Sequence, residues 1–267
     1  MTGFLLQKFF YDLWDNLFRI MALNLGFLVS LSLVFVLPPL IGGTLPGLLV
    51  FCLLVFWLFV YLCAASAALE PVSNYRTLSL GDFVKNLTSS LVPGTALFFL
   101  ALVIFVIIRF TIPVYLRFGT VFGTAAAFFC CWICLFFLGT LQFYPAVYRR
   151  LGKRPLICLK KCFILFFDNT GFCIFSLLVN LIFTVLIIPC PGWSLLFLDE
   201  GLRLRILKYD APNFPRAGEN SGRKPRGVKL RGVKLRRDPV PWKELLAEER
   251  EKTGRRSWRD FLFPWRQ

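Results

Sequence analysis

Long apolar runs dominate the chain, and charged residues are confined to the segments between them. Four stretches contain no charged residue: 20–69, 86–108, 118–148 and 169–198, with lengths of 50, 23, 31 and 30 residues. A helix needs about 20 apolar residues to cross the hydrocarbon core of a bilayer, and a charge left there is costly. Because the first stretch is long enough for two crossings, the pattern predicts an integral membrane protein with at least five membrane segments.

Proline and glycine residues mark where these runs divide. Pro38-Pro39 and Gly42-Gly43 interrupt the first stretch, which therefore predicts a hairpin of two helices. The predicted membrane segments are Ile20–Pro38, Leu45–Leu69, Pro93–Ile112, Val121–Tyr144 and Gly171–Ile188. Amphipathic patterns predict interfacial helices at residues 3–18, after a capping box formed by Ser79 and Asp82, and at Pro155–Phe167. The fold class is therefore all-α, a polytopic helical membrane protein.

Basic residues outside the membrane segments indicate the topology. Residues 149–161 and 203–237 are both strongly basic, and basic loops stay on the cytoplasmic side. An even number of crossings must then separate them, so Trp193–Leu207 has to return after the fifth segment. This limb contains Asp199 and Arg203, so it would cross only partly, or as a protein-shielded helix in which these two residues pair. We expect this returning hairpin, with six segments and both termini inside; five segments with an external tail is the alternative.

The nine cysteines are expected to be packing residues rather than metal ligands or redox centres. Cys131 and Cys134 form a C-x-x-C pair, but it lies within an apolar helix, where cysteine behaves as a small hydrophobic residue. Cys158 and Cys162 are one helical turn apart, yet the chain has no histidine and only Asp168 nearby, which is too few ligands for zinc. We therefore expect no metal and no cofactor.

The C-terminal part of the chain is basic. Residues 203–237 hold 12 Lys or Arg against Asp210 and Glu219, and they include a tandem repeat of Arg-Gly-Val-Lys-Leu. We expect a membrane domain over 1–207, a disordered basic linker over 208–240 and short amphipathic helices over 241–267. Contacts to anionic lipid headgroups are predicted for Lys229, Arg231, Lys234, Arg236 and Arg237; phosphate of RNA or the ribosome is the alternative partner. The predicted interfacial anchors are Trp14, Trp258, Phe261 and Trp265.

A few polar residues fall inside the apolar runs and define a possible intramembrane polar site: Asn24, Arg109 and Asn180. Arg109 lies close enough to the end of its segment for the side chain to snorkel to water. Asn24 and Asn180 can form hydrogen bonds between helices. A structural role is therefore favoured over substrate binding for all three residues.

Two segments of the chain are similar to each other at a spacing of about 80 residues. The first of these segments contains the second membrane segment, an amphipathic helix and the third membrane segment. The other contains the fourth membrane segment, an amphipathic helix and the fifth membrane segment, in the same order. Residues 103–108 align with residues 183–188. A parallel repeat and the general likeness of apolar helices both explain this similarity.

Short motifs spread from Phe9 to about Lys208 resemble the YesL-like family of small bacterial multi-spanning membrane proteins. They are Leu13-Trp14-Asp15-Asn16-Leu17-Phe18 before Leu23-Asn24-Leu25, Pro38-Pro39 to Gly43, Leu80-Gly81-Asp82-Phe83, Tyr144-Pro145-Ala146 with Arg149-Arg150, and Pro191-Gly192. The resemblance implies a helical membrane protein without an established enzyme activity, of a family often encoded beside carbohydrate transport systems. The basic tail and Asp199-Glu200 depart from the family pattern.

The sequence shows no nucleophile–base pair, phosphate-cradling glycine loop or carboxylate dyad, which favours a non-enzymatic protein. With the resemblance, we expect an accessory or regulatory component associated with solute transport, carbohydrate in particular. One alternative is a transporter in its own right, which would need a polar cavity. Another is a membrane-protein biogenesis factor whose tail contacts ribosomes or RNA. The expected location is the inner (cytoplasmic) membrane of a bacterial cell, with the basic tail in the cytoplasm.

Overall fold

The computed structural model describes residues 2–152, 154–186, 191–210, 242 and 246–254. This described part consists of helices and the turns between them, without a strand. Its contacts divide the chain into two compact units. The membrane unit is Phe9–Leu202, and the terminal unit combines Met1–Lys8 with Arg203–Gln267. The helix α1 (Thr2–Asp15) runs from the terminal unit into the membrane unit.

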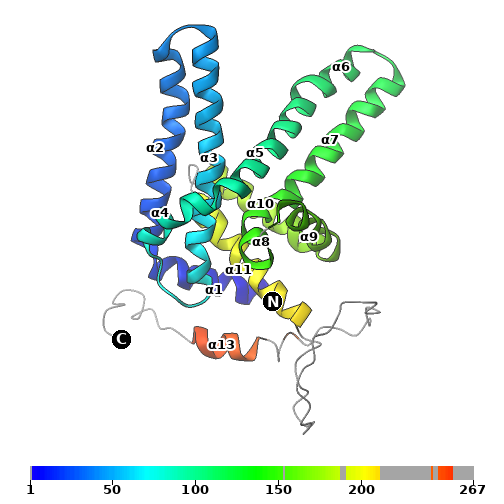
Figure 1. Ribbon diagram of the computed structural model, residues 1–267. Helices are drawn as coiled ribbons and strands as arrows, with labels where there is room; N and C mark the ends of the chain where they lie inside the picture. Colours follow the sequence, from blue (N-terminus) through cyan, green and yellow to red (C-terminus); the bar gives the residue numbers. More distant parts are fainter. Residues whose placement is uncertain (1, 153, 187–190, 211–241, 243–245, 255–267) are drawn as a thin grey trace. The chain divides into compact units, whose positions relative to one another are not determined.

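The first predicted hairpin is confirmed in the membrane unit. It consists of α2 (Leu17–Ile41) and α3 (Thr44–Ser73), which pack against each other (Figure 1). Gly42 and Gly43 turn the chain at positive φ angles of 67° and 76°, which glycine adopts without a steric penalty. α2 continues through Pro38-Pro39 to Ile41, although each of these prolines lacks the backbone N–H that would bond to the carbonyl four residues earlier.

A second hairpin follows, and one of its arms contains a π-helical turn. α5 (Leu91–Val106) continues through the π turn Ile107–Thr111 into α6 (Ile112–Arg117), and α7 (Val121–Leu141) runs back beside α6. Thr120 caps α7, since its hydroxyl oxygen accepts from the Gly123 amide at 3.1 Å. In Figure 1 the tips of both hairpins point away from α8.

Four helical stretches of the described chain are long and apolar enough to cross a membrane: Leu17–Ile41, Thr44–Ser73, Leu91–Arg117 and Val121–Leu141. A fifth candidate is the pair of Pro155–Asp168 and Thr170–Phe183, which is bent by 103°. The chain is therefore an all-α, multi-pass membrane protein. The expected sixth segment is not among these candidates, because α11 (Pro191–Asp210) carries Asp199, Glu200, Arg203 and Arg205.

The predicted return of the chain after the fifth segment is nevertheless present. α10 (Thr170–Leu186) and α11 lie antiparallel, as shown by ring contacts of Phe175 with Phe197 at 6.2 Å and of Phe183 with Trp193 at 6.3 Å. At the beginning of α11, the Gly192 amide donates to Asn24 Oδ1 at 2.8 Å. Asn24 lies about 10 Å along α2 from its start, whereas α2 is about 37 Å long. The tip of the α10–α11 hairpin therefore reaches only part of the way along α2.

Shorter helices connect these elements. α4 (Leu80–Ser89) begins after Ser79 as predicted, but the expected capping box is wrong, since the Ser79 side chain makes no cap hydrogen bond. The loop before α4 is instead held by Asn16, which lies between α1 and α2: Asn16 Oδ1 accepts from the Leu78 amide at 3.0 Å. After α7 come α8 (Tyr144–Leu151) and the predicted amphipathic helix α9 (Pro155–Asp168).

Candidate functional site: buried polar clusters of the membrane unit

A buried ion pair joins three helices of the membrane unit. Arg150 on α8 donates to Asp199 on α11 through two bonds, Nε to Oδ1 at 2.7 Å and Nη2 to Oδ2 at 2.6 Å. Ser73 at the end of α3 completes the cluster: its hydroxyl donates to Asp199 Oδ2 at 2.6 Å and accepts from Arg150 Nη2. Asp199 is 1% exposed and the Arg150 side chain 10%. This bidentate geometry ties the end of α8 and the middle of α11 to the end of α3.

The surroundings keep Arg150 charged. Burial alone lowers the pKa of a guanidinium, but the hydrogen bond to Asp199 and the charges of Asp199, Glu70 and Glu200 outweigh burial, so the pKa of Arg150 is raised above its ordinary value. A buried pair of this kind is suited to holding helices in register. A second pair, Arg149 with Glu70 at 2.9 Å, joins α8 to α3 at the partly exposed surface.

A chain of uncharged polar side chains joins α7, α10 and α11. Gln142, directly after α7, donates to the carbonyl oxygens of Gly139 and Cys173 at 2.9 Å each. Its Oε1 accepts from Asn180 Nδ2 at 3.0 Å, and Asn180 Oδ1 accepts from the Ser194 hydroxyl at 2.5 Å. These bonds hold the α10–α11 hairpin together and attach it to α7.

The same three side chains line one part of a cavity of about 310 Å³. The other lining residues are apolar: Phe27, Leu62, Leu97, Leu141, Pro145, Pro191, Leu195 and Leu198. They come from α2, α3, α5, α7, α8 and α11, so the cavity lies between both hairpins and the beginning of α11. None of the described residues that line it is charged.

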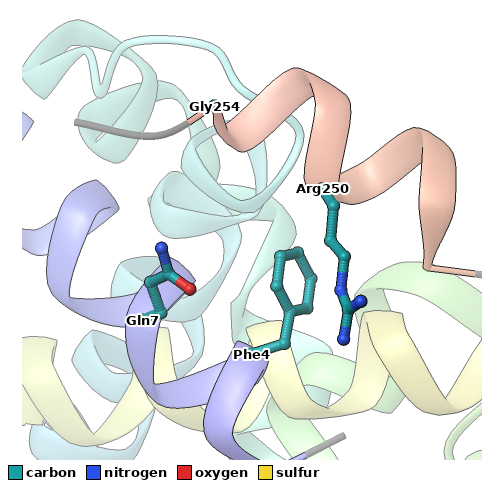
Figure 2. A pocket seen from close by; sticks show the side chains of 4 residues that line it. All are labelled: Phe4, Gln7, Arg250 and Gly254. Carbon is teal, nitrogen blue, oxygen red and sulfur yellow. The ribbon is translucent and has the colours of Figure 1, made fainter. Parts of the chain in front are cut away.

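The terminal unit has a pocket of its own, of about 360 Å³ (Figure 2). It is lined by Phe4 and Gln7 of α1 and by Arg250 and Gly254 at α13 (Ala247–Thr253). The guanidinium of Arg250 lies 5.9 Å from the centre of the Phe4 ring. α13 also contributes Glu249, which pairs with Arg203 at 2.8 Å. One helix within the predicted C-terminal region is present at Ala247–Thr253, and it ends at Gly254.

The structure brings two of the three predicted intramembrane polar residues to the α10–α11 hairpin. Asn24 accepts from Gly192 and Asn180 bonds to Gln142 and Ser194, so both have the interhelical role that was expected. Arg109 is not with them, because it lies exposed on the π turn of the second hairpin. Trp14 is partly exposed on α1 and stacks on Phe10 at 6.2 Å.

Other predicted contact residues lie outside the part that the structure describes: Lys229, Arg231, Lys234, Arg236, Arg237, Trp258, Phe261 and Trp265. The described cysteines are all free thiols. Cys134 is buried, Cys130 half-buried and Cys131 exposed on α7. In the described residues, no three His, Cys, Asp or Glu side chains are grouped so that they could hold a metal ion.

One predicted pairing is wrong. Asp199 binds Arg150 and Ser73, and Arg203 binds Glu249, so the expected pair of Asp199 with Arg203 one turn away does not form. The role of Ser73 was not predicted. Two features of the sequence could have indicated the pair of Arg150 with Asp199. The acidic dipeptide Asp199-Glu200 lies in an apolar limb, and Arg149-Arg150 lies directly after a membrane segment.

These features define a multi-pass helical membrane protein whose buried polar groups connect helices. Comparison with known proteins adds no further identity, because no family model, no curated protein and no solved structure matches the chain.

Proposed function

We propose that this chain is a non-enzymatic accessory or regulatory protein of the inner (cytoplasmic) membrane that acts by binding another integral membrane protein. The resemblance to the YesL-like family makes a component of a solute transport system, carbohydrate in particular, the favoured partner. The protein then contributes apolar helix surface to the complex rather than a catalytic site.

The observation that carries this proposal is how little of the apolar helices the chain buries by itself. In the four spans, only 28%, 28%, 22% and 17% of the most apolar window is buried. The α5–α7 hairpin is the extreme case, with large exposed side chains on both arms, among them Phe99, Val103, Phe105, Phe128, Phe129 and Trp132. Spans that enclosed a transport route of their own would pack around it on more than one side.

The polar groups of the cavity also favour an accessory role over a transport route. Gln142, Asn180 and Ser194 bond to one another or to backbone carbonyls, and most of the cavity beside them is apolar. A sugar carries a hydroxyl on nearly every carbon, and each one buried without a partner is costly. This lining therefore favours an accessory role over a sugar transporter in its own right.

Exposed Arg109 is consistent with a protein partner on the second hairpin. It lies eight residues, about 12 Å, before the end of α6, within a stretch that is otherwise long and apolar enough to span. A carboxylate or polar group of a partner helix would neutralise it at that depth. The competing explanation is snorkelling to the lipid headgroups.

Site-specific photo-crosslinking tests the proposal in whole cells. A crosslinking residue at Phe105 or Phe128, both exposed, is expected to capture one integral membrane protein in a saturable manner. The same residue at Leu97, which is 8% exposed inside the membrane unit, is the matched control and is expected to give crosslinks within the chain. Capture of lipid alone at every exposed position would contradict the proposal, and capture of ribosomal proteins would favour the biogenesis alternative.

A further inference from the structure

The cavity of the membrane unit is bordered by one residue from each of the four candidate membrane spans: Phe27, Leu62, Leu97 and Leu141. Phe27, one of its lining residues, is ten residues along α2 from Leu17, which corresponds to about 15 Å. That is half of a hydrocarbon core of about 30 Å. The cavity also adjoins Pro191 and Ser194 in the first turn of α11. The tip of the α10–α11 hairpin therefore forms the polar end of the cavity.

The lining selects an apolar occupant. Eight of the eleven lining residues are apolar and none is charged. A bound water needs two to four polar partners, and here the three polar side chains lie together and already bond to each other. A volume of about 310 Å³ is at the low end of ligand pockets, which suits a single chain rather than a whole lipid.

The polar end accepts one hydrogen bond. The Ser194 hydroxyl uses its proton for Asn180 Oδ1, at 2.5 Å, so its oxygen keeps lone pairs that can accept from a ligand. Gln142 uses both amide protons on the carbonyl oxygens of Gly139 and Cys173. A ligand with a hydroxyl donor therefore fits this end better than one with a carboxylate, which would bring a charge that nothing in the lining neutralises.

We propose that this cavity binds a single alkyl or acyl chain that carries a hydroxyl group near its end, with the hydroxyl donating to Ser194. A monoacylglycerol of the membrane and a free fatty alcohol both have this chemistry. The site is separate from the partner-binding surface proposed above and does not depend on it.

Photolabelling of the full chain in nanodiscs tests the proposal. The probe is a medium-chain fatty alcohol that carries a diazirine, and a second arm uses a monoacylglycerol with the diazirine in its acyl chain. We expect saturable labelling of the peptides that contain Leu97 and Leu195, displaced by unlabelled alcohol and not by glucose. Native mass spectrometry of the protein as purified then separates the two sources, since only a membrane lipid would co-purify.

Three variants make the test specific. Ser194→Ala should weaken binding of the alcohol about fivefold, the loss of one hydrogen bond, and leave binding of its methyl ether unchanged. Leu195→Trp fills the cavity and should abolish saturable labelling, whereas Leu53→Trp, on an exposed face of α3, should not. Non-saturable labelling spread over the exposed spans of the wild-type protein would overturn the proposal, and so would unchanged labelling in a folded Leu195→Trp. If Leu195→Trp does not fold, the map of labelled wild-type peptides decides.

Discussion

Asp199 and Arg150 carry opposite charges in a region of the membrane unit where little water reaches either side chain. Each charge loses its hydration on burial, and the two compensate each other only while both are present. Ser73 adds a hydroxyl that bonds to both groups. The pair therefore matters less as a source of net stability than as a constraint, because removing one partner leaves the other charge buried.

This constraint gives a first prediction. Asp199→Asn should lower the free energy of unfolding by about 3–5 kcal/mol, since Arg150 stays charged and buried without a counter-charge. Thermal unfolding in detergent measures the loss. The matched control is Glu70→Gln, which removes a pair at the partly exposed surface and should cost less than about 1 kcal/mol. Equal losses for the two variants would show that the buried pair imposes no such constraint.

Tyr144 at the start of α8 gives a second prediction. Its side chain is fully buried, and in the described part of the chain its hydroxyl has no hydrogen-bond partner. Tyr144→Phe should therefore leave stability unchanged or raise it slightly, because it removes an unsatisfied polar group.

The difference in the free energy of unfolding between Tyr144→Phe and the wild-type protein should depend on pH. Burial, and to a lesser degree the neighbouring Cys63, Cys158, Tyr148 and Cys162, raise the pKa of Tyr144 in the folded state. The unfolded phenol ionises near its ordinary pKa of about 10, so wild-type stability is lost as the pH rises above that value, and the variant escapes this loss. Unfolding at about pH 8 and about pH 11 measures it; a constant difference would contradict the prediction.

At the level of whole elements, apolar run length and proline–glycine breaks were sufficient to predict most helices. The observed α2, α3, α7, α9 and α10 lie within a few residues of the predicted segments. The π turn around Arg109 could not be predicted, because its residues are as compatible with an α-helix as with a π-helix. The partner of Asp199 was also missed, since a local pair one turn away was considered and the actual partner lies 49 residues earlier in the chain.

Close contact between α3 and α5 gives a third prediction. A Cβ atom on Gly94 of α5 would lie 2.8 Å from the Cα atom of Val60, a backbone atom of α3 that cannot rotate away. Gly94→Ala should therefore destabilise the unit by about 1–3 kcal/mol through overpacking. Gly171→Ala on α10 is the control, because nothing lies within 4 Å of its Cβ position and alanine favours the helix. Thermal unfolding of both variants checks the prediction, and a stabilised Gly94→Ala would show that the helices can separate at no cost.

For the whole molecule, the α10–α11 hairpin bears on how the basic residues 149–161 and 203–237 can lie on the same side of the membrane. Only one clearly apolar segment separates these two regions in the sequence. Crossing by all four candidate spans would return the chain to the side on which it started and would place α8 and α9, with Arg149, Arg150, Lys160 and Lys161, on the same side as the beginning of α2. A hairpin that reaches only part of the way along α2 returns without crossing. Two basic segments can thus share one side although Trp193–Leu207 is too charged to be an independent span.

The last prediction is that residues 153 and 224 are both cytoplasmic. Single cysteines at Lys153 and Lys224, in a cysteine-free background, should react with a membrane-impermeant maleimide only after cell lysis, because basic segments stay inside. Cysteines at Leu45 and Val121, exposed at the tips of the two hairpins, should react in intact cells. Their reaction also shows that the background protein is inserted. Labelling of positions 153 and 224 from opposite faces would mean that the segment between them crosses an odd number of times, and the fifth candidate span bent at residue 169 would then be a true crossing.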